Sequence, residues 1–450
     1  MDGISGVTAD SINDHADSSL YTEERDRRFD CSRLPASEAA HQFVIEVVSN
    51  LNGLESRQRA RRVADQERYV ASVTALALDL IHREMTKPGG WIAVSMDKTE
   101  YKPETRKAPF LTEAFLQLVT QMHLGGLVDL RKGEQGAFGT GRRTTVRAAP
   151  WLISRMKAFD VSLGDIKSNP KLRGDSLVLR SPKVRGRSRD LKVPESDATA
   201  KMRSEMTLIN DWIADADLGW AWYEDESPID LGQRFLRRIF NGSLELGGRL
   251  YGGFWQGIKS EIRLEGLCFG EDFAVALDFG QMAIRSAYTR VGTQPPEGDL
   301  YEVPGFERYR YGIKLVLNAL LSARQMPSRF PVGTRGDIPA KYSFDEVLQA
   351  IELRHSAIAP LFGAGISLEL MRCESDLLVA ILLRLREQGV VALPIHDCLL
   401  VGDGNKDITR RTMAVTFKEM LGSESSIAVY SADIFSTPSV APDAPHKKGA

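Results

Sequence analysis

The stretch VVALPIHDCLLVGDG, residues 390–404, carries an imidazole and a carboxylate, His396 and Asp397, in the middle of an apolar run. The apolar residues on either side predict two short strands, and the polar pair between them predicts the turn of a β-hairpin. A carboxylate in apolar surroundings is costly unless a partner compensates its charge. The stretch therefore indicates a rigid hairpin whose tip presents Asp397 to a ligand.

A second aspartate follows a strand-like run in FAVALDFGQMAIRSAYTR, residues 273–290. Asp278 ends this run, and the residues after it have helical spacing. Two aspartates from adjacent strands can bridge a pair of magnesium ions, because Mg²⁺ takes few protein carboxylates and keeps several waters. The two strand ends therefore favour two-metal phosphoryl transfer, with Asp278 and Asp397 as the ligands.

A helix is predicted between these two segments, over residues 307–324 with the sequence ERYRYGIKLVLNALLSAR. Arg310, Lys314 and Asn318 are four residues apart and therefore share one face of that helix. Two cations one turn apart repel each other unless a polyanion lies across from them, and a nucleoside triphosphate is such a polyanion. An ordinary solvated helix face is the alternative interpretation.

These segments resemble motifs of the family A DNA polymerases and of the single-subunit phage-type RNA polymerases, and suggest a compact member of the kind found on mobile elements. The matching residues are Asp278, Gln281, Ile284 and Arg285 in DFGQMAIR (278–285), Arg310 and Lys314 in the fingers helix, and IHDCLLV (395–401) in the second palm motif. GGRLYGGFWQGI (247–258) is similar to the segment that contacts primer and template in that family. CESDLLVAILLRLREQGVVALPIHD (373–397) has the expected layout of a helix leading into the hairpin. The motifs occur in the family's order over roughly 235–435.

The resemblance implies an α+β fold: a right-hand polymerase palm, made of an antiparallel sheet with helices, together with fingers. It implies magnesium as the cofactor, with manganese as a substitute, and DNA template and nucleoside triphosphates as partners. The implied metal ligands are Asp278, Asp397 and the Phe279 carbonyl, and His396 would position the primer terminus or the 3′ nucleotide. The implied nucleotide-binding residues are Arg310, Lys314 (also as proton donor to the leaving group), Asn318, Gln281 and Ala283, and Arg249 and Gln256 would contact nucleic acid.

Two departures from the DNA-polymerase pattern favour ribonucleotides. Ala283 replaces the glutamate that helps those enzymes exclude the ribose 2′-hydroxyl, and Cys398 replaces their third acid. The fingers helix also lacks the family's later aromatics, with Asn318 and Ser322 in their place, which predicts low fidelity. The chain has room for only a small thumb, which predicts low processivity. We therefore expect a primase or RNA polymerase-like nucleotidyltransferase acting on DNA, with a family A-like DNA polymerase as the alternative.

A different signature precedes this region, at residues 109–158. The sequence predicts a helix that ends near Gly125-Gly126, a short strand, and a glycine-rich hairpin with a basic return strand, which is the order of a winged helix. The hairpin cations Arg142, Arg143 and Arg147 are expected to contact DNA phosphates, and the helix to enter a groove. A module used only for internal packing is one alternative. Another is a DNA-binding replication initiator or regulator whose palm is inactive.

The expected organisation follows from these motifs and from composition. The predicted segments are 1–35 (disordered), 36–160 (helical and winged-helix-like, DNA-binding), 161–200 (basic linker), 201–245 (small thumb-like helices), 246–437 (palm and fingers) and 438–450 (flexible tail).

Composition excludes several other classes of protein. The net charge is −2, so nucleic-acid binding must come from local basic patches. The four cysteines form no CxxC pair, and no apolar run approaches the roughly 18 residues of a membrane span. The first residues lack the features of a signal peptide. We expect a cytoplasmic protein with no membrane partner.

Two other chemistries are disfavoured. An HD phosphohydrolase needs further histidine ligands, and the other six histidines form no motif with His396. Cys398 lies two residues from His396, which allows a thiol nucleophile, but a small buried hydrophobe is the simpler role.

Overall fold

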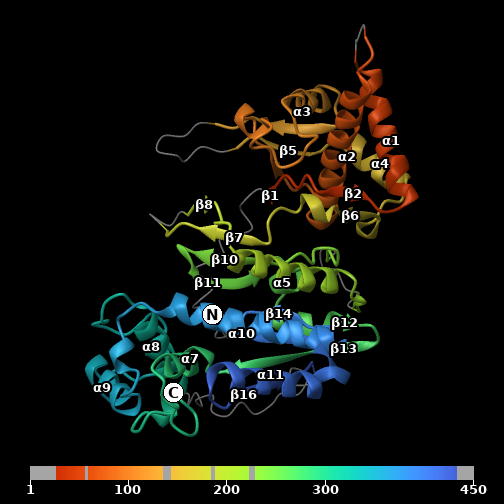
Figure 1. Cartoon of the computed structure of the whole chain (residues 1–450). Helices are drawn as coiled ribbons and strands as arrows, with labels where there is room; N and C mark the ends of the chain where they lie inside the picture. The colour runs from red at the N-terminus through yellow and green to blue at the C-terminus, as the bar shows by residue number, and fades with distance from the viewer. Residues whose placement is uncertain (1–26, 56–58, 135–142, 184–187, 222–228, 433–450) are drawn as a thin grey trace, which may run out of the picture. The chain divides into compact units, whose positions relative to one another are not determined.

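The computed structural model describes residues 27–55, 59–134, 143–183, 188–221 and 229–432 (Figure 1). The chain divides into two compact units. Unit 1 comprises residues 1–174 and 224–232, and unit 2 comprises residues 175–223 and 233–450. Both units combine helices with strands, so the expected α+β class is confirmed.

The centre of unit 1 is helix α2, Val63–Thr86, which is buried without interruption from Ser72 to His82. A helix that is buried on all sides lies inside a core, and the other helices of unit 1 pack on this one. Their bounds are Glu38–Gly53 for α1, Ala114–Leu124 for α3 and Pro150–Ala158 for α4, with short 3₁₀ turns at Lys98–Tyr101 (η4), Leu163–Asp165 (η6) and Pro170–Leu172 (η7).

The main sheet of unit 1 has the order β1-β3-β5-β4. Its strands are Arg27–Arg28 (β1), Ile92–Ala93 (β3), Val128–Arg131 (β4) and Thr145–Ala148 (β5), and β5 is antiparallel to both β3 and β4. Along the chain, α2 is followed by β3, α3 and the β4–β5 hairpin. The predicted helix end is confirmed, since α3 stops at Leu124 and the left-handed Gly126 (φ +73°) turns the chain into β4.

Two of the predicted segment boundaries are wrong in this part of the chain. Residues 27–35 are ordered as β1 and as β2 (Arg33–Pro35), which pairs with β6 (Ile166–Ser168). The supposed linker at 161–200 contains β6 and two strands of unit 2, β7 (Leu177–Arg180) and β8 (Asp190–Leu191). The many basic residues of this segment predicted a solvated linker, although Leu177 and Leu179 alternate with other residues as in a strand. Residues 1–26 and 433–450 lie outside the described residues.

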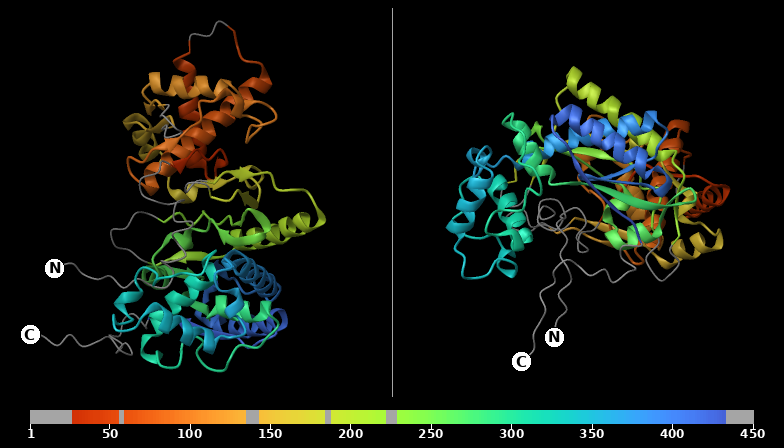
Figure 2. Two further views of the ribbon diagram at one scale, coloured as in Figure 1. Left: turned by 90° about the vertical axis from the view of Figure 1, so that its left-hand side faces the viewer. Right: turned by 90° about the horizontal axis from the view of Figure 1, so that it is seen from below.

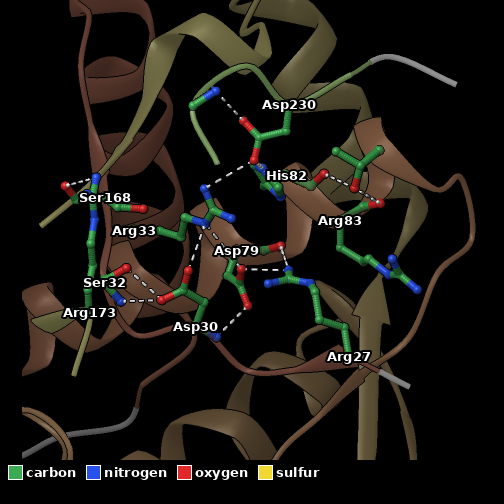
Figure 3. Close-up of polar contacts among 12 residues, drawn as sticks. Arg27, Asp30, Ser32, Arg33, Asp79, His82, Arg83, Ser168, Arg173 and Asp230 are labelled. Atoms are coloured by element: carbon green, nitrogen blue, oxygen red, sulfur yellow. Dashed lines mark hydrogen bonds and ion pairs between the residues drawn. The ribbon is translucent and has the colours of Figure 1, made fainter. Parts of the chain in front are cut away.

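A buried polar cluster lies beside α2 (Figure 3). We define this polar cluster as Arg27, Asp30, Arg33, Asp79, His82 and Asp230. The Asp79 carboxylate is fully buried and accepts from Arg27 Nη2 at 2.6 Å and from the Asp30 N–H at 2.9 Å. His82 Nε2 lies 2.6 Å from Asp230 Oδ2. Asp230 belongs to the segment that returns to unit 1 after β9 (Leu218–Trp220) of unit 2, so the cluster fastens that segment to α2.

The pKa values of the cluster show that its charges compensate one another. Burial alone would raise the pKa of Asp230, but His82 and Arg33 outweigh burial and lower it. The pKa of Asp30 is also lowered, because Arg33 and Ser32 outweigh the effect of burial. These carboxylates are therefore stabilised as anions inside unit 1.

Unit 2 is built on a six-stranded sheet of order β14-β15-β13-β12-β9, in which β16 also pairs with β13. The strands are Leu218–Trp220 (β9), Leu267–Phe269 (β12), Asp272–Gly280 (β13), Leu393–Ile395 (β14), Cys398–Gly402 (β15) and Ser426–Tyr430 (β16). The central strand β13 is antiparallel to both β15 and β16. Its run Ala274–Leu277 is buried, as expected for a strand in the middle of a sheet.

A second sheet of unit 2 has the order β11-β10-β7-β8, with β10 at Arg237–Asn241 and β11 at Ser243–Tyr251. The prediction of thumb-like helices over 201–245 is therefore wrong in part. Helix α5, Asp197–Ala214, is present, but β9, β10 and the start of β11 follow it.

The remaining helices pack on these sheets and on one another. They are Ser260–Gly266 (α6), Met282–Arg290 (α7), Arg310–Ser322 (α8), Phe344–Arg354 (α9), Ser367–Glu387 (α10) and Lys406–Leu421 (α11), with 3₁₀ turns at Phe254–Gly257 (η8), Glu307–Tyr309 (η9), Thr334–Gly336 (η10), Ala359–Leu361 (η11) and Asp403–Asn405 (η12). Helix α10 packs against β11, α7 and α11. Helices α8 and α9 share a core with α7 and lie to one side of the main sheet (Figures 1 and 2). Among the described residues, the helices are all too short or too polar to cross a membrane.

His355, just after α9, is fully buried in the core shared by α7, α8 and α9. Its Nε2 is 2.9 Å from the Leu300 carbonyl, which can only accept, so Nε2 carries the proton. Tyr288 then donates its hydroxyl hydrogen to Nδ1 at 2.9 Å. The ring is held neutral, and burial lowers the pKa of His355 to about 4.

This histidine predicts a pH-dependent stability. Below pH 6.5 the unfolded chain protonates His355 while the folded chain does not, so stability is complete above pH 6.5 and falls as the pH drops toward 4. The loss from this group approaches about 3 kcal/mol at pH 4. Urea unfolding of His355→Gln between pH 7 and 4 is expected to show a shallower slope than wild type, with His41→Gln on the exposed side of α1 as the control. An unchanged slope would contradict the assignment.

Candidate active site

The two predicted aspartates are brought together by the pairing of β13 with β15. Asp278 lies opposite Cys398 in the register, next to Asp397. The Phe279 N–H donates to the Asp397 carbonyl at 3.2 Å, so the backbones of the two segments are hydrogen-bonded at this point. Residues that are 119 positions apart in the sequence therefore meet at one place on the sheet.

The turn that carries Asp397 is tight and strained. His396 and Asp397 form a two-residue loop between β14 and β15, whose end residues Ile395 and Cys398 pair. His396 has φ +54°, a left-handed conformation that favours glycine in such hairpins. Non-glycine residues in this conformation cost roughly 1–3 kcal/mol and gather at functional sites. The left-handed backbone of His396 therefore lowers the stability of the fold relative to a glycine at this position.

The surroundings of Asp397 raise its pKa well above the usual range. The causes are removal of its carboxyl from water, then the negative charges of Glu374 and Asp278. Arg249 acts in the opposite direction. Asp397 thus lies buried among other carboxylates, and a divalent cation would relieve the repulsion between them.

Glu374 on α10 was not predicted as part of the site. It forms a bidentate ion pair with Arg249 on β11. Arg249 Nε donates to Oε1 of Glu374 at 2.7 Å, and Nη2 donates to Oε2 at 2.9 Å. Burial would lower the pKa of Arg249, but Glu374 outweighs burial and raises it. Nothing in the sequence joins Arg249 to Glu374, which lie 125 positions apart.

His396 is neutral in this setting. Burial, together with the positive charges of Arg249 and Arg263, lowers its pKa to about 3. Its ring meets the edge of Tyr251 at 5.8 Å between ring centres. Within the described part of the chain, its buried Nδ1 has no hydrogen-bond partner. A buried ring nitrogen without a partner is a candidate for a functional role.

The predicted triphosphate helix is α8, and its polar face meets a loop that was not predicted as part of the site. Asp299 accepts from the Nε of Arg310, from Gln281 Nε2 at 2.5 Å and from the Tyr301 N–H at 2.8 Å. The Tyr301 ring lies 5.1 Å from the guanidinium of Arg310 and 5.9 Å from Lys314 Nζ. Burial, together with Asp397, Asp299 and Asp278, raises the pKa of Tyr301. Tyr301 is thus in contact with the cations of α8 and within electrostatic range of the paired aspartates.

The other predicted residues of unit 2 occupy the surroundings of this site. Asn318 is half-buried on the same face of α8 as Lys314. Ala283 is half-buried near the start of α7 and packs against the core shared with α8. Gln256 folds back on the main chain, donating to the Leu250 and Pro394 carbonyls at 2.8 and 3.1 Å. It therefore links β11 to the β14–β15 hairpin.

The predicted hairpin cations belong to unit 1. Arg147 is paired with Asp129 at 2.8 Å and stacks with Arg131 on the Trp91 ring, at 4.8 and 3.8 Å respectively. Arg143 is exposed. Arg142 lies outside the described residues.

Magnesium suits the chemistry of the Asp278–Asp397 pair. Across the described residues, no three His, Cys, Asp or Glu side chains form a complete protein cage for a metal ion. Magnesium does not require one, because it is commonly held by one or two carboxylates and by the phosphates of a substrate. Burial, Glu374 and Asp278 raise the pKa of Asp397, and a bound divalent cation would favour its charged form.

Comparisons with known proteins do not identify the function of this chain. No family model and no curated protein matches the chain. A solved structure of the POL domain of Pol1 from M. smegmatis, in complex with DNA primer-template and dNTP, aligns at 12% sequence identity and a TM-score of 0.28. The alignment covers 93% of this chain and 71% of that one. A TM-score this low is too weak to assign a fold or a function to this chain.

Proposed function

We propose that the protein is a template-directed nucleotidyltransferase that uses two-metal phosphoryl transfer. Unit 2 supplies the palm-like sheet with the metal ligands Asp278 and Asp397 and the Phe279 carbonyl, and α8 supplies a fingers-like cationic face. The reaction class is that of a primase or RNA polymerase acting on DNA; a family A-like DNA polymerase is the alternative. Unit 1 is proposed as a winged-helix-like DNA-binding module.

One observation carries this proposal: the pairing of β13 with β15 places Asp278 beside Asp397. Bound magnesium would activate the attacking hydroxyl and stabilise the leaving pyrophosphate. Arg310 and Lys314 would hold the triphosphate, with Lys314 as proton donor to the leaving group. His396, whose Nδ1 is unpartnered within the described residues, would position the 3′ end.

The test is incorporation of labelled nucleotide on a single-stranded DNA template, with and without a primer. Parallel reactions contain ribo- or deoxyribonucleotides and magnesium, manganese or a chelator. Metal-dependent extension that follows the template sequence is expected. Tight DNA binding with no incorporation under any of these conditions would instead support the initiator alternative.

Removal of either cation from α8 is expected to weaken nucleotide use strongly. Arg310→Ala and Lys314→Ala should each lower kcat/KM by roughly a hundredfold, because clamps on a transferring phosphoryl group are typically worth a few kcal/mol. Steady-state kinetics with varied nucleotide checks this result. Arg308→Ala, an exposed cation in η9, is the matched control and should leave the kinetics unchanged. Near-normal kinetics for both α8 variants would reject their roles.

Ala283 is expected to control the choice of sugar. Ala283→Glu places a longer acidic side chain at the start of α7, where it would compete with a 2′-hydroxyl. We expect a shift of the ribo- to deoxyribonucleotide ratio of kcat/KM by roughly ten- to a hundredfold toward deoxyribonucleotides. Ala283→Gln separates bulk from charge. If neither variant moves the ratio, position 283 does not select the sugar.

A further inference from the structure

The carbonyl of Pro394 lies on β14, two residues before His396, and two side chains of η8 converge on it. Trp255 donates its indole N–H to this oxygen at 2.9 Å, and Gln256 donates from Nε2 at 3.1 Å. A carbonyl oxygen has two lone pairs, so these two donors complete its hydrogen bonding. Trp255 is fully buried and Pro394 is buried as well, so this contact is shielded from water.

Pro394 is at the edge of the main sheet, where its main chain faces away from β15. Strand β14 is the last one in the order β14-β15-β13-β12-β9. Ile395 and Cys398 pair beside the turn, and main-chain groups alternate in direction along an antiparallel strand, so the Pro394 carbonyl points outward. Proline suits an edge strand because it has no N–H to pair. The side chains of η8 therefore take the place of a neighbouring strand at this point.

The amide of Gln256 is engaged at both of its polar atoms. Oε1 accepts from the Gly252 N–H at 2.8 Å and from the Gly253 N–H at 3.2 Å, while Nε2 also donates to the Leu250 carbonyl at 2.8 Å. With the bond to Pro394, these contacts use both hydrogens and both lone pairs of the amide. The resemblance implied that Gln256 contacts nucleic acid, but this arrangement favours a role inside the protein.

Trp255 is itself held firmly in place. Its carbonyl accepts from Arg263 Nη1 at 2.9 Å, and its ring meets the edge of Phe254 at 5.3 Å between ring centres. The ring also lies so close to Gly253 that a Cβ atom there would clash with it. The indole N–H is therefore a fixed donor, directed at the outer edge of β14.

We propose that Trp255 and Gln256 are positioning residues for the turn that carries Asp397. They act through the Pro394 carbonyl. His396 in this turn has a left-handed backbone (φ +54°), and such a conformation persists only where the surrounding structure holds it. Because Asp397 follows directly, a shift of Pro394 would displace its carboxylate. Removal of groups that orient metal ligands typically costs ten- to a hundredfold in metal affinity or activity.

The hold on the turn is independent of the reaction, whereas its effect on catalysis rests on the proposed function, in which Asp397 binds a divalent cation. A fully buried side chain does not touch nucleotide or nucleic acid, so Trp255 can act only through its neighbours. The other residue of 247–258 that the resemblance assigned to nucleic acid, Arg249, is likewise engaged internally, by Glu374.

Hydrogen exchange tests the hold on the turn, with no metal, nucleotide or DNA present. Trp255→Phe removes one donor and keeps most of the ring, and Gln256→Met keeps the length of the side chain without its amide. In both variants the amides of residues 393–400 should exchange about five- to tenfold faster than in wild type, since each loses a buried hydrogen bond. Exchange in α8 is the internal reference for unfolding of the whole unit.

Asn210→Ala is the matched control for this experiment. Asn210 on α5 is a buried amide that accepts from the Leu236 N–H at 2.7 Å and donates to the Leu236 carbonyl at 3.0 Å. Its loss should leave exchange at 393–400 unchanged relative to α8. Unchanged exchange at 393–400 in both test variants, or an equal increase in α8, would overturn the proposal.

Metal binding and kinetics separate positioning from contact with nucleic acid. Both test variants should lower kcat about tenfold and weaken binding of Mn²⁺ alone about tenfold, with the nucleotide KM and the primer-template affinity within about twofold of wild type. Weaker DNA binding by Gln256→Met, with kcat and Mn²⁺ binding unchanged, would overturn the proposal. If Asp397→Asn bound Mn²⁺ like wild type, the proposed metal site would be wrong, and the exchange readout would still decide the hold on the turn.

Discussion

Asp397→Asn is expected to abolish nucleotide incorporation, lowering kcat by about a thousandfold or more. Asparagine keeps the shape of the side chain but cannot neutralise a divalent cation, and electrostatic stabilisation is usually the largest contribution to such catalysis. Asp278→Asn should have a similar effect. The measurement is single-turnover extension under saturating nucleotide, so that a change in binding does not mask a change in chemistry.

The two aspartates are expected to act as one unit. If both hold the same ions, the double variant should be no slower than either single variant, because the effects of groups that act together are not additive. Asp403→Asn, exposed in η12 just beyond β15 and paired with Lys406, is the control and should remain active. Multiplicative losses, or substantial activity in either single variant, would contradict the metal assignment.

Asp397→Asn should also leave the fold intact. Without divalent ions, the Asp397 carboxylate is buried and repelled by Glu374 and Asp278, and both effects raise its pKa. The asparagine variant is therefore expected to melt at the same temperature as wild type or higher. An inactive variant that is fully folded distinguishes a chemical loss from unfolding.

The local parts of this site were predictable from the sequence, because each depends on a short pattern. The apolar runs before Asp278 and around His396-Asp397 predicted strands and a turn. The structure has strands β13, β14 and β15 at these places. The four-residue spacing of Arg310, Lys314 and Asn318 predicted that they share one face of a helix, and all three lie in α8.

The parts that were missed depend on contacts between distant segments. Glu374 reads as one more polar residue on an amphipathic helix, and only the packing of α10 on β11 brings it to Arg249. Asp299 and Tyr301 lie in a loop, where apolar residues follow neither helical nor strand-like spacing. The polar cluster of unit 1 depends on Asp230, which reaches His82 across 148 positions. Hydrophobic periodicity specifies which face of an element is buried, but not which distant polar group it meets.

Asp79→Ala is expected to be the most destabilising substitution in unit 1, lowering its free energy of unfolding by about 3–5 kcal/mol. The change leaves Arg27 and Arg33 with excess positive charge and leaves the Asp30 N–H without its acceptor. Breaking a buried ion pair from one side costs the unpaired charge as well as the lost contact. Urea unfolding of the full chain, followed by hydrogen exchange of amides in α2, measures this loss within unit 1.

Asp65→Ala provides the matched control, because Asp65 is on the same helix and its ion pair with Arg68 is exposed. An exposed pair contributes at most about 1 kcal/mol, so this variant should unfold nearly as wild type does. Asp230→Asn tests the second half of the cluster, since it weakens the contact with His82 but leaves Asp79 in place. We expect faster exchange at residues 229–232 in that variant, with α2 protected. If Asp79→Ala cost no more than Asp65→Ala, the cluster would not be what holds the returning segment to α2.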